Sequence, residues 1–234
     1  MTTIPSRLLY AIFLLITSTL MSCGAYSTMQ TARTVEEKHG EISLNLFSPR
    51  GFIDAITQVV DKDHDNYFTL PYIQVSGKYG ITDQIDAGIN LNTYGQMGLE
   101  GKYMLVGDHN SLFSLSPGLS FNTFFFYFYD FQIPLHASVH PLPNLGIYLT
   151  PRYIGQFVGL FGLENESYFD YASISTGIMY GDRIKFGLDI TAAFPLGKFY
   201  RVDIFPNIYN FGVGVKWTIG KSKDNSNPGN KIRF

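Results

Sequence analysis

The feature that most constrains this chain is an alternation, with a period of two, between apolar residues and small or polar residues. In the segment IKFGLDIT (184–191) every second residue is Ile, Phe or Leu, and Lys, Gly, Asp and Thr stand between them. The same pattern occurs in 72–79, 85–91, 112–122 and 209–219. Successive side chains of a β-strand point to opposite faces, so the pattern predicts strands with one apolar face and one small, polar face.

Ten segments fit this pattern, and connections of two kinds separate them. The predicted strands are 40–47, 70–80, 84–93, 97–106, 111–122, 126–139, 144–155, 167–180, 184–194 and 208–220. Short turns rich in Asn, Asp, Gly and Pro lie at 82–84, 107–110, 141–144 and 181–183, whereas the connections 48–69, 157–167 and 195–207 are longer. An even number of strands, with short turns at one end and longer loops at the other, is typical of a transmembrane β-barrel.

The composition indicates which face of the barrel meets lipid. Charged residues make up 15 % of the chain, against about 25 % in a typical soluble domain. Gly, Ser and Asn pack poorly as the core of a soluble barrel but can line the lumen of a membrane barrel. We therefore predict an all-β, antiparallel up-and-down transmembrane β-barrel of ten strands. The alternative is a membrane-tethered, lipocalin-like carrier, in which Ile73, Ile89, Leu119, Phe186 and Val213 would point inward.

The N-terminus has the features of a secretory signal. Arg7 precedes the apolar run 8–16, which is shorter than the roughly 20 residues of a membrane-spanning helix. Leu20-Met21-Ser22-Cys23-Gly24 follows and resembles the bacterial lipobox, which implies removal of residues 1–22 and lipidation of Cys23. Cys23 is the only Cys, so the sequence predicts neither a disulfide nor a thiolate metal site. The alternative is an ordinary signal peptide that contains a buried thiol.

The last predicted strand carries a further resemblance. Asn210, Gly212, Val215 and Trp217 resemble the assembly signal of bacterial outer-membrane β-barrels. Membership of that broad group implies an outer-membrane location, contact with outer-membrane lipid, and the barrel-assembly and lipoprotein-processing machinery as partners. The net charge of −2 gives no basic surface for nucleic acid. The chain is thus divided into the signal peptide (1–22), a linker from the lipidated Cys (23–39), the barrel (40–220) and a polar tail (221–234).

Charged residues on the polar faces are the candidate lumen residues. They are Lys78, Asp86, Glu100, Lys102, Arg152, Lys185, Asp189 and Lys216. Ten strands enclose a narrow interior, in which unpaired charge is costly, so we expect opposite charges to pair and to fill the lumen. The alternative is a selective pore lined by the excess of five cations over three anions.

The sequence gives little support for catalysis or for a metal site. The acidic loop 61–66 places Asn66 and Tyr72 where a calcium-binding EF-hand needs Gly and Glu, so we interpret it as a solvated loop and predict no metal and no cofactor. The alternative is a calcium site or an Asp/His hydrolytic pair at the rim. His136 would face the lumen near Ser138, where a base could activate a hydroxyl. A lumen His that is hydrogen-bonded to a polar neighbour is the simpler interpretation, and we predict that the protein is not an enzyme.

Two anomalies suggest a route for apolar molecules. Pro117, Pro134 and Pro151 interrupt three neighbouring predicted strands at one depth, which indicates either bulges or a wall that opens sideways. Such breaks give the chain a distant resemblance to the OmpW-like and fatty-acid-transporter families. The aromatic run FFFYFY (124–129) falls at the tip of a hairpin, where Phe124, Phe126 and Phe128 would face the mouth and could contact an apolar ligand.

The sequence thus predicts an outer-membrane β-barrel lipoprotein with a structural or narrow-pore role and no assigned substrate. Two alternatives stay open. One is a lateral-gate transporter or binder of small hydrophobic molecules, and the other is the tethered carrier barrel described above.

Overall fold

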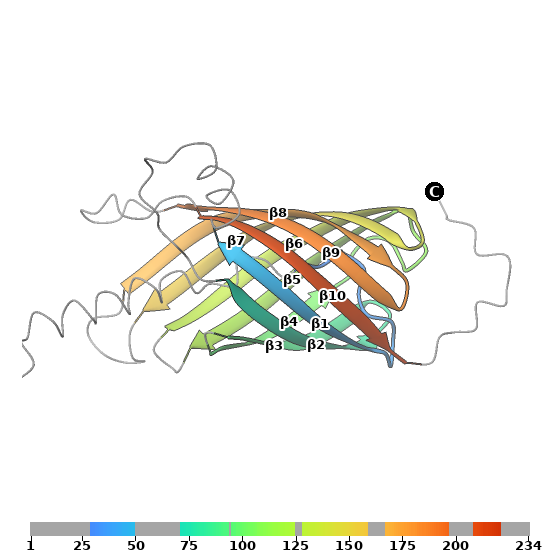
Figure 1. Ribbon diagram of the computed structural model, residues 1–234, viewed down its shortest axis with the longest axis horizontal. Coiled ribbons are helices and arrows are strands. Elements are labelled where there is room, and N and C mark those ends of the chain that lie inside the picture. The colour runs from blue at the N-terminus through green and yellow to red at the C-terminus, as the bar shows by residue number, and fades with distance from the viewer. Residues whose placement is uncertain are drawn as a thin grey trace, which may run out of the picture.

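The computed structural model describes residues 29–49, 71–93, 95–124, 128–158, 167–196 and 208–220. Ten antiparallel strands form a closed barrel in which each strand pairs with its sequence neighbours and β1 pairs with β10 (Figure 1). The strands are β1 (Gly40–Pro49), β2 (Tyr72–Thr82), β3 (Ile85–Asn92), β4 (Gln96–Tyr103), β5 (Phe113–Phe124), β6 (Phe128–Leu142), β7 (Leu145–Val158), β8 (Ser167–Gly181), β9 (Ile184–Pro195) and β10 (Ile208–Ile219).

The predicted ten-stranded barrel is confirmed, and each strand end lies within three residues of its prediction. The largest differences include the end of β4, which was predicted at 106 and lies at Tyr103. The connections after β2, β4, β6 and β8 lie at the end of the barrel that we call the short-turn end, and those after β1, β3, β5, β7 and β9 lie at the long-loop end (Figure 1). Across the described ranges, no helix is long and apolar enough to cross a membrane.

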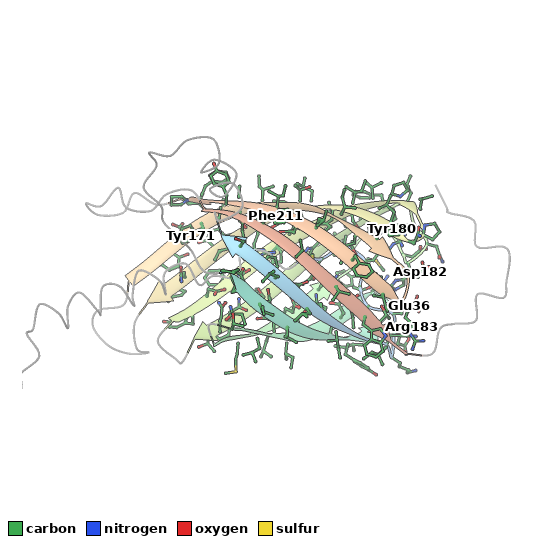
Figure 2. All side chains as sticks on the ribbon, in the orientation of Figure 1. Glu36, Tyr171, Tyr180, Asp182, Arg183 and Phe211 are labelled. Carbon is green, nitrogen blue, oxygen red and sulfur yellow. The ribbon has the colours of Figure 1, made fainter. Side chains whose placement is uncertain are left out.

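The outer face of the barrel is apolar. All five residues that distinguish the two barrel types point outward, with exposed fractions from 37 % at Val213 to 64 % at Phe186. Side chains project from the whole outer surface of the strands, among them Tyr180 near the short-turn end (Figure 2). The soluble, lipocalin-like alternative is therefore wrong, and the exposed apolar belt is the lipid-facing surface of a transmembrane barrel.

Aromatic rings gather on the outer surface near the long-loop end. Phe157 stacks on Tyr129 at 4.9 Å between ring centroids and contacts Tyr168 at 4.8 Å. Phe131 lies 5.8 Å from Tyr153 in the same cluster. The position of this cluster near one end of the barrel fits the aromatic girdles that flank the apolar band of membrane barrels.

The inner face carries small hydroxyl and amide side chains that hydrogen-bond across strands. Ser43 of β1 lies 2.6 Å from Ser76 of β2, and Ser175 of β8 lies 2.7 Å from Thr191 of β9, oxygen to oxygen. All four residues are buried. The inner face is thus polar, as the alternation predicts.

The N-terminal segment lies inside this lumen. Residues 29–38, which we call the arm, were predicted only as part of a linker. Met29 and Ala32 are fully buried, and at the short-turn end the Lys38 N–H donates to the Gly80 carbonyl at 2.9 Å. Lys38 has a φ of +61°, where the chain turns into β1. The arm therefore runs from the rim at the short-turn end into the interior of the barrel.

The outward face predicts how charge affects stability. We expect Leu188→Arg, in the middle of β9, to lower the free energy of unfolding by about 2–4 kcal/mol, because its side chain would face hydrocarbon. Ile184→Arg, at the short-turn end of the same strand, is the matched control and should cost about 0–1 kcal/mol. Reversible urea unfolding in lipid vesicles measures both. Equal costs would contradict the assignment of this face to lipid.

Candidate functional site

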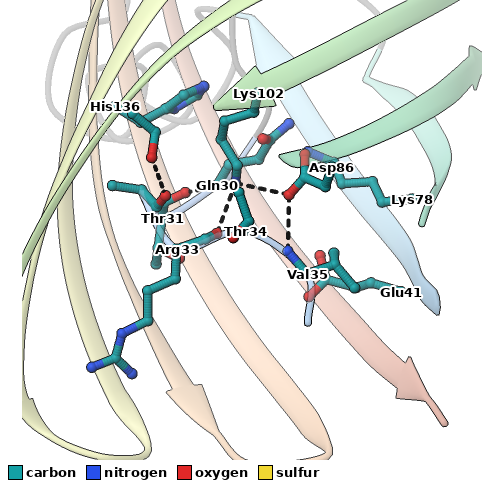
Figure 3. Close-up of polar contacts among 12 residues, drawn as sticks. Gln30, Thr31, Arg33, Thr34, Val35, Glu41, Lys78, Asp86, Lys102 and His136 are labelled. Carbon is teal, nitrogen blue, oxygen red and sulfur yellow. Dashed lines mark hydrogen bonds and ion pairs between the residues drawn. The ribbon is translucent and has the colours of Figure 1, made fainter. Parts of the chain in front are cut away.

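The candidate site is the lumen, and its half nearer the short-turn end is held by ion pairs. Lys78 Nζ lies 3.2 Å from Glu100 Oε1, and Lys102 Nζ lies 3.5 Å from Asp86 Oδ2 (Figure 3). The two lysines and Asp86 are buried, and Glu100 is nearly so. Asp86 of β3 and Lys102 of β4 are partners in the sheet, whereas Lys78 of β2 and Glu100 of β4 lie on either side of Gly88 of β3.

A further ion-pair cluster centres on Glu41, which the sequence analysis missed. Its carboxylate lies 2.9 Å from Lys216 Nζ and 3.7 Å from Lys185 Nζ. Lys216 is buried, whereas the Lys185 side chain is 36 % exposed. Glu41 begins the same inward row as Ser43 and Asn45, so the alternation in β1 was a signal that could have identified it.

In the other half of the lumen, hydrogen bonds hold the charged side chains of Asp130 and Arg152. The Asp130 carboxylate accepts from Asn122, Gln132 and Gln96, at 2.7, 2.8 and 2.9 Å. Arg152 donates to the Gln132 side-chain oxygen at 3.1 Å. Asp130 was also missed, although it shares the inward row of Gln132 on β6.

The Asp189 carboxylate is held separately by two hydroxyl groups. Tyr148 Oη donates to it at 2.6 Å and Thr191 Oγ1 at 2.9 Å.

The described charges of the lumen wall balance. The cations are Lys78, Lys102, Arg152, Lys185 and Lys216, and the anions are Glu41, Asp86, Glu100, Asp130 and Asp189. Five positive and five negative charges leave no formal excess, because Glu41 and Asp130 join the three anions expected from sequence. A lumen with this balance gives no basis for strong selection between anions and cations.

The arm is attached to the lumen wall through both its main chain and its side chains. Lys102 Nζ donates to the carbonyls of Thr31 and Arg33 at 3.1 and 2.8 Å, and the Val35 N–H donates to Asp86 Oδ2 at 2.9 Å (Figure 3). Ala32 donates its N–H to Ser138 Oγ at 3.0 Å and accepts from Ser116 Oγ. Gln30 donates to Glu100 at 2.8 Å.

At the short-turn rim, Asp83 fixes the point where the arm leaves the lumen. Its carbonyl accepts from Thr34 Oγ1 at 2.6 Å, and its carboxylate accepts from the Glu37 N–H at 3.1 Å. His109 Nε2 also lies 3.2 Å from that carbonyl. Burial lowers the pKa of His109 from its ordinary value, so the neutral ring donates to Asp83 at neutral pH. Arg33 donates to the Ser111 carbonyl at 2.8 Å.

The histidines of β6 do not form a free catalytic pair. The hydrogen-bond partner of His136 Nδ1 is Thr150 Oγ1, at 3.1 Å, and not the Ser138 hydroxyl. Ser138 Oγ lies 2.9 Å from His140 Nε2 and accepts from the Ala32 N–H. Its hydroxyl is therefore engaged by both the wall and the arm. Over the described residues no group of three His, Cys, Asp or Glu side chains could hold a metal ion.

Several predicted features lie outside the described residues. They include the lipidation site Cys23, the acidic loop 61–66, and Phe126 in the aromatic run. The main chains of Phe124 and Phe128 pair with each other as the last residues of the β5–β6 ladder, and the structure describes no more of these two residues. The apolar ligand contact proposed for the three phenylalanines stays a prediction.

A small cavity lies between the arm and the wall. Gln30 lines it from the arm, and Lys102, Pro134, His136 and Arg152 line it from the wall. Its volume is about 10 Å³, room for about one water molecule. The arm and the lumen side chains thus leave very little open space in this part of the barrel.

Comparison with known proteins relates the chain to other barrels through fold alone. No protein-family model and no curated protein matches it. Among solved structures it is similar to the N-terminal β-barrel domain of Pseudomonas aeruginosa OprF, with 12 % identity over 78 % of this chain and 98 % of that chain and a TM-score of 0.36.

It is also similar to the NanC porin, with 11 % identity over 75 % of this chain and 98 % of that chain and a TM-score of 0.46. A third similar structure is LpxR from Salmonella typhimurium, with 6 % identity over 76 % of this chain and 99 % of that chain and a TM-score of 0.42. At such identities the likeness bears on neither substrate nor catalysis. The expectation that this protein is not an enzyme therefore stays a prediction.

The buried pair Lys78–Glu100 should be strongly coupled. We expect Lys78→Met or Glu100→Gln alone to lower the free energy of unfolding by about 3–5 kcal/mol, because each leaves a buried charge without its counter-ion. The double variant should cost less than the sum of the two, which a double-mutant cycle by urea unfolding measures. Lys38→Met, in the exposed pair with Glu37, is the control and should leave the unfolding midpoint unchanged. Strict additivity for Lys78 and Glu100 would contradict the pairing.

Proposed function

We propose that this chain is an outer-membrane β-barrel lipoprotein whose lumen is closed by its own N-terminal arm, with a structural or tightly restricted permeability role. The observation that carries the proposal is the arm itself, which lies buried in the lumen and is bonded to β3, β4, β5 and β6. No catalytic role is proposed.

Two further features support closure rather than free conduction. The cavity beside the arm has room for about one water molecule. The ten described charges of the lumen wall balance, and several form ion pairs between nearby strands. An ion entering this lumen would have to break those pairs and displace the arm.

Removing the arm should open the barrel. We expect the intact chain to show little or no conductance in planar lipid bilayers and a variant lacking residues 24–36 to conduct, because the deletion empties the centre of the lumen. Ala32→Trp should also increase conductance, because Ala32 is fully buried and the larger side chain would prevent the arm from seating in the lumen.

Glu37→Trp, at an exposed position of the same segment, is the matched control and should behave as the intact chain. Each variant is first checked for a heat-modifiable band on gels, which identifies a folded barrel. Equal conductance in all folded variants would exclude closure by the arm.

The lipoprotein part of the proposal concerns Cys23 and rests on the lipobox-like sequence that precedes it. We expect cells that express the chain to incorporate labelled palmitate into it and Cys23→Ser to abolish that incorporation. An intact chain that takes up no label would show that the N-terminus is an ordinary signal peptide.

A lateral route for small hydrophobic molecules is the second candidate function, and the proline-rich part of the wall favours it. The β5–β6 ladder passes from the pair Pro117–Leu135 to the pair Ser120–Gln132, without paired positions between them. The β6–β7 ladder likewise passes from Pro134–Arg152 to Ala137–Leu149. These gaps lie side by side, and Pro134 also lines the cavity behind them.

Restoring the ladder should reduce passage through this part of the wall. We expect the combined Pro117→Ala, Pro134→Ala and Pro151→Ala variant to take up a fluorescent hydrophobic probe more slowly than the intact chain, because the three new N–H groups can join the ladder. Pro141→Ala, near the end of β6, is the control and should not change uptake. Unchanged uptake in the triple variant would remove the lateral route.

A further inference from the structure

The bonds between the arm and the lumen wall go mainly to main-chain atoms of the arm. Lys102 contacts two carbonyls, Ser116 a third, and Ser138 and Asp86 each accept one N–H. These five bonds cover the stretch from Thr31 to Val35. Every residue except Pro offers the same main-chain donor and acceptor, so contacts of this kind recognise an extended chain and not a particular sequence.

The four side chains that make these contacts belong to the wall, and three of them also have partners within it. Lys102 and Asp86 form an ion pair, and Ser138 is hydrogen-bonded to His140. The residues of these two pairs are buried and lie on strands β3, β4 and β6, and Figure 3 shows Lys102 and Asp86 beside the arm. The barrel therefore presents a row of donors and acceptors along its lumen, most of which also have a partner in the wall.

The wall also leaves space for the largest buried side chain of the arm, that of Met29. A Cβ at Gly187 or Gly214 would lie 2.7 Å from the Met29 sulfur, and a Cβ at Gly212 would lie 3.2 Å from its methyl carbon. Larger residues at these positions of β9 and β10 would fill the space that Met29 occupies. At Ala32, between Ser116 and Ser138, only a small side chain fits.

We propose that the lumen is a binding site for an extended polypeptide, and that the arm is its resident, exchangeable occupant. A second segment with a small residue at the place of Ala32 makes the same main-chain bonds and takes the arm's position. The inference rests on the proposed closure by the arm and adds the class of ligand that the lumen accepts.

The test uses the barrel that lacks residues 24–36 and a fluorescent peptide, MQTARTVEE, which has the sequence of residues 29–37. A tethered arm competes at an effective concentration on the order of millimolar, so its removal exposes the site. We expect the peptide to bind, by fluorescence anisotropy, and to block the conductance of this barrel. A peptide in which Met29 and Ala32 keep their places and the other residues are permuted should bind comparably, and Ala32→Trp should abolish binding.

Methylation of the peptide nitrogen separates main-chain from side-chain recognition. An N-methyl group at Ala32 removes the N–H that Ser138 accepts and should weaken binding by about tenfold. In the barrel, Lys102→Met should weaken binding of every peptide. Lys185→Met removes the same charge next to Glu41 and serves as the matched control that leaves binding unchanged.

The outcomes distinguish this inference from the proposed closure. A barrel that conducts without the arm but binds no peptide overturns the inference and leaves closure intact. Binding without any gain in conductance overturns closure alone. Equal affinity of the methylated and unmethylated peptides overturns main-chain recognition. If the shortened barrel does not fold, hydrogen exchange at the Ala32 and Val35 amides of the full chain is measured with peptide in excess. Unchanged protection of these amides would overturn the proposal that a peptide can replace the arm.

Discussion

Lipid offers main-chain groups no hydrogen-bond partner, and this constraint determines the wall of the barrel. Each unpaired N–H or C=O in hydrocarbon costs several kcal/mol, so a sheet that crosses a membrane must close on itself. Here Gly40 of β1 faces Tyr79 of β2 on one side and Ile219 of β10 on the other. In a closed wall the alternation leaves one arrangement, in which the apolar face meets lipid and the small, polar face lines the lumen.

The polar inner face creates a second requirement, because buried charges and amides must also find partners. Ion pairs such as Lys78–Glu100 give some of these groups partners within the wall, and the arm provides partners for others. Lys102 has Asp86 at 3.5 Å and reaches two arm carbonyls at shorter distances. The wall in turn satisfies main-chain groups of the arm that would otherwise be buried without partners. Each therefore stabilises the other, which accounts for an arm without regular secondary structure inside a barrel.

The sequence was sufficient for the barrel but not for its contents. The ten strands were predictable because alternation and turn residues are local properties of the chain. Their ends were less exact, since pairing continues into the turn at β6 and stops before the predicted end at β4. Glu41 and Asp130 were missed although the same alternation includes them. The position of the arm was not predictable. The wall bonds mainly to its main-chain atoms, and such bonds require no particular residue pattern in QTARTVEE. The ligand contact at Phe124, Phe126 and Phe128 is still a prediction.

Main-chain recognition also explains where the sequence of the arm does matter. At Ala32 the arm passes between Ser116 and Ser138, and a small side chain is required because both hydroxyls contact its main chain. At Met29 the requirement is reversed, because the glycines of β9 and β10 leave a space that a long, flexible side chain fills. Glycines of the wall face the large Met29 side chain, and serines of the wall face the small Ala32. A lumen that held only water would need neither match, so the complementarity indicates an interior shaped around a polypeptide chain.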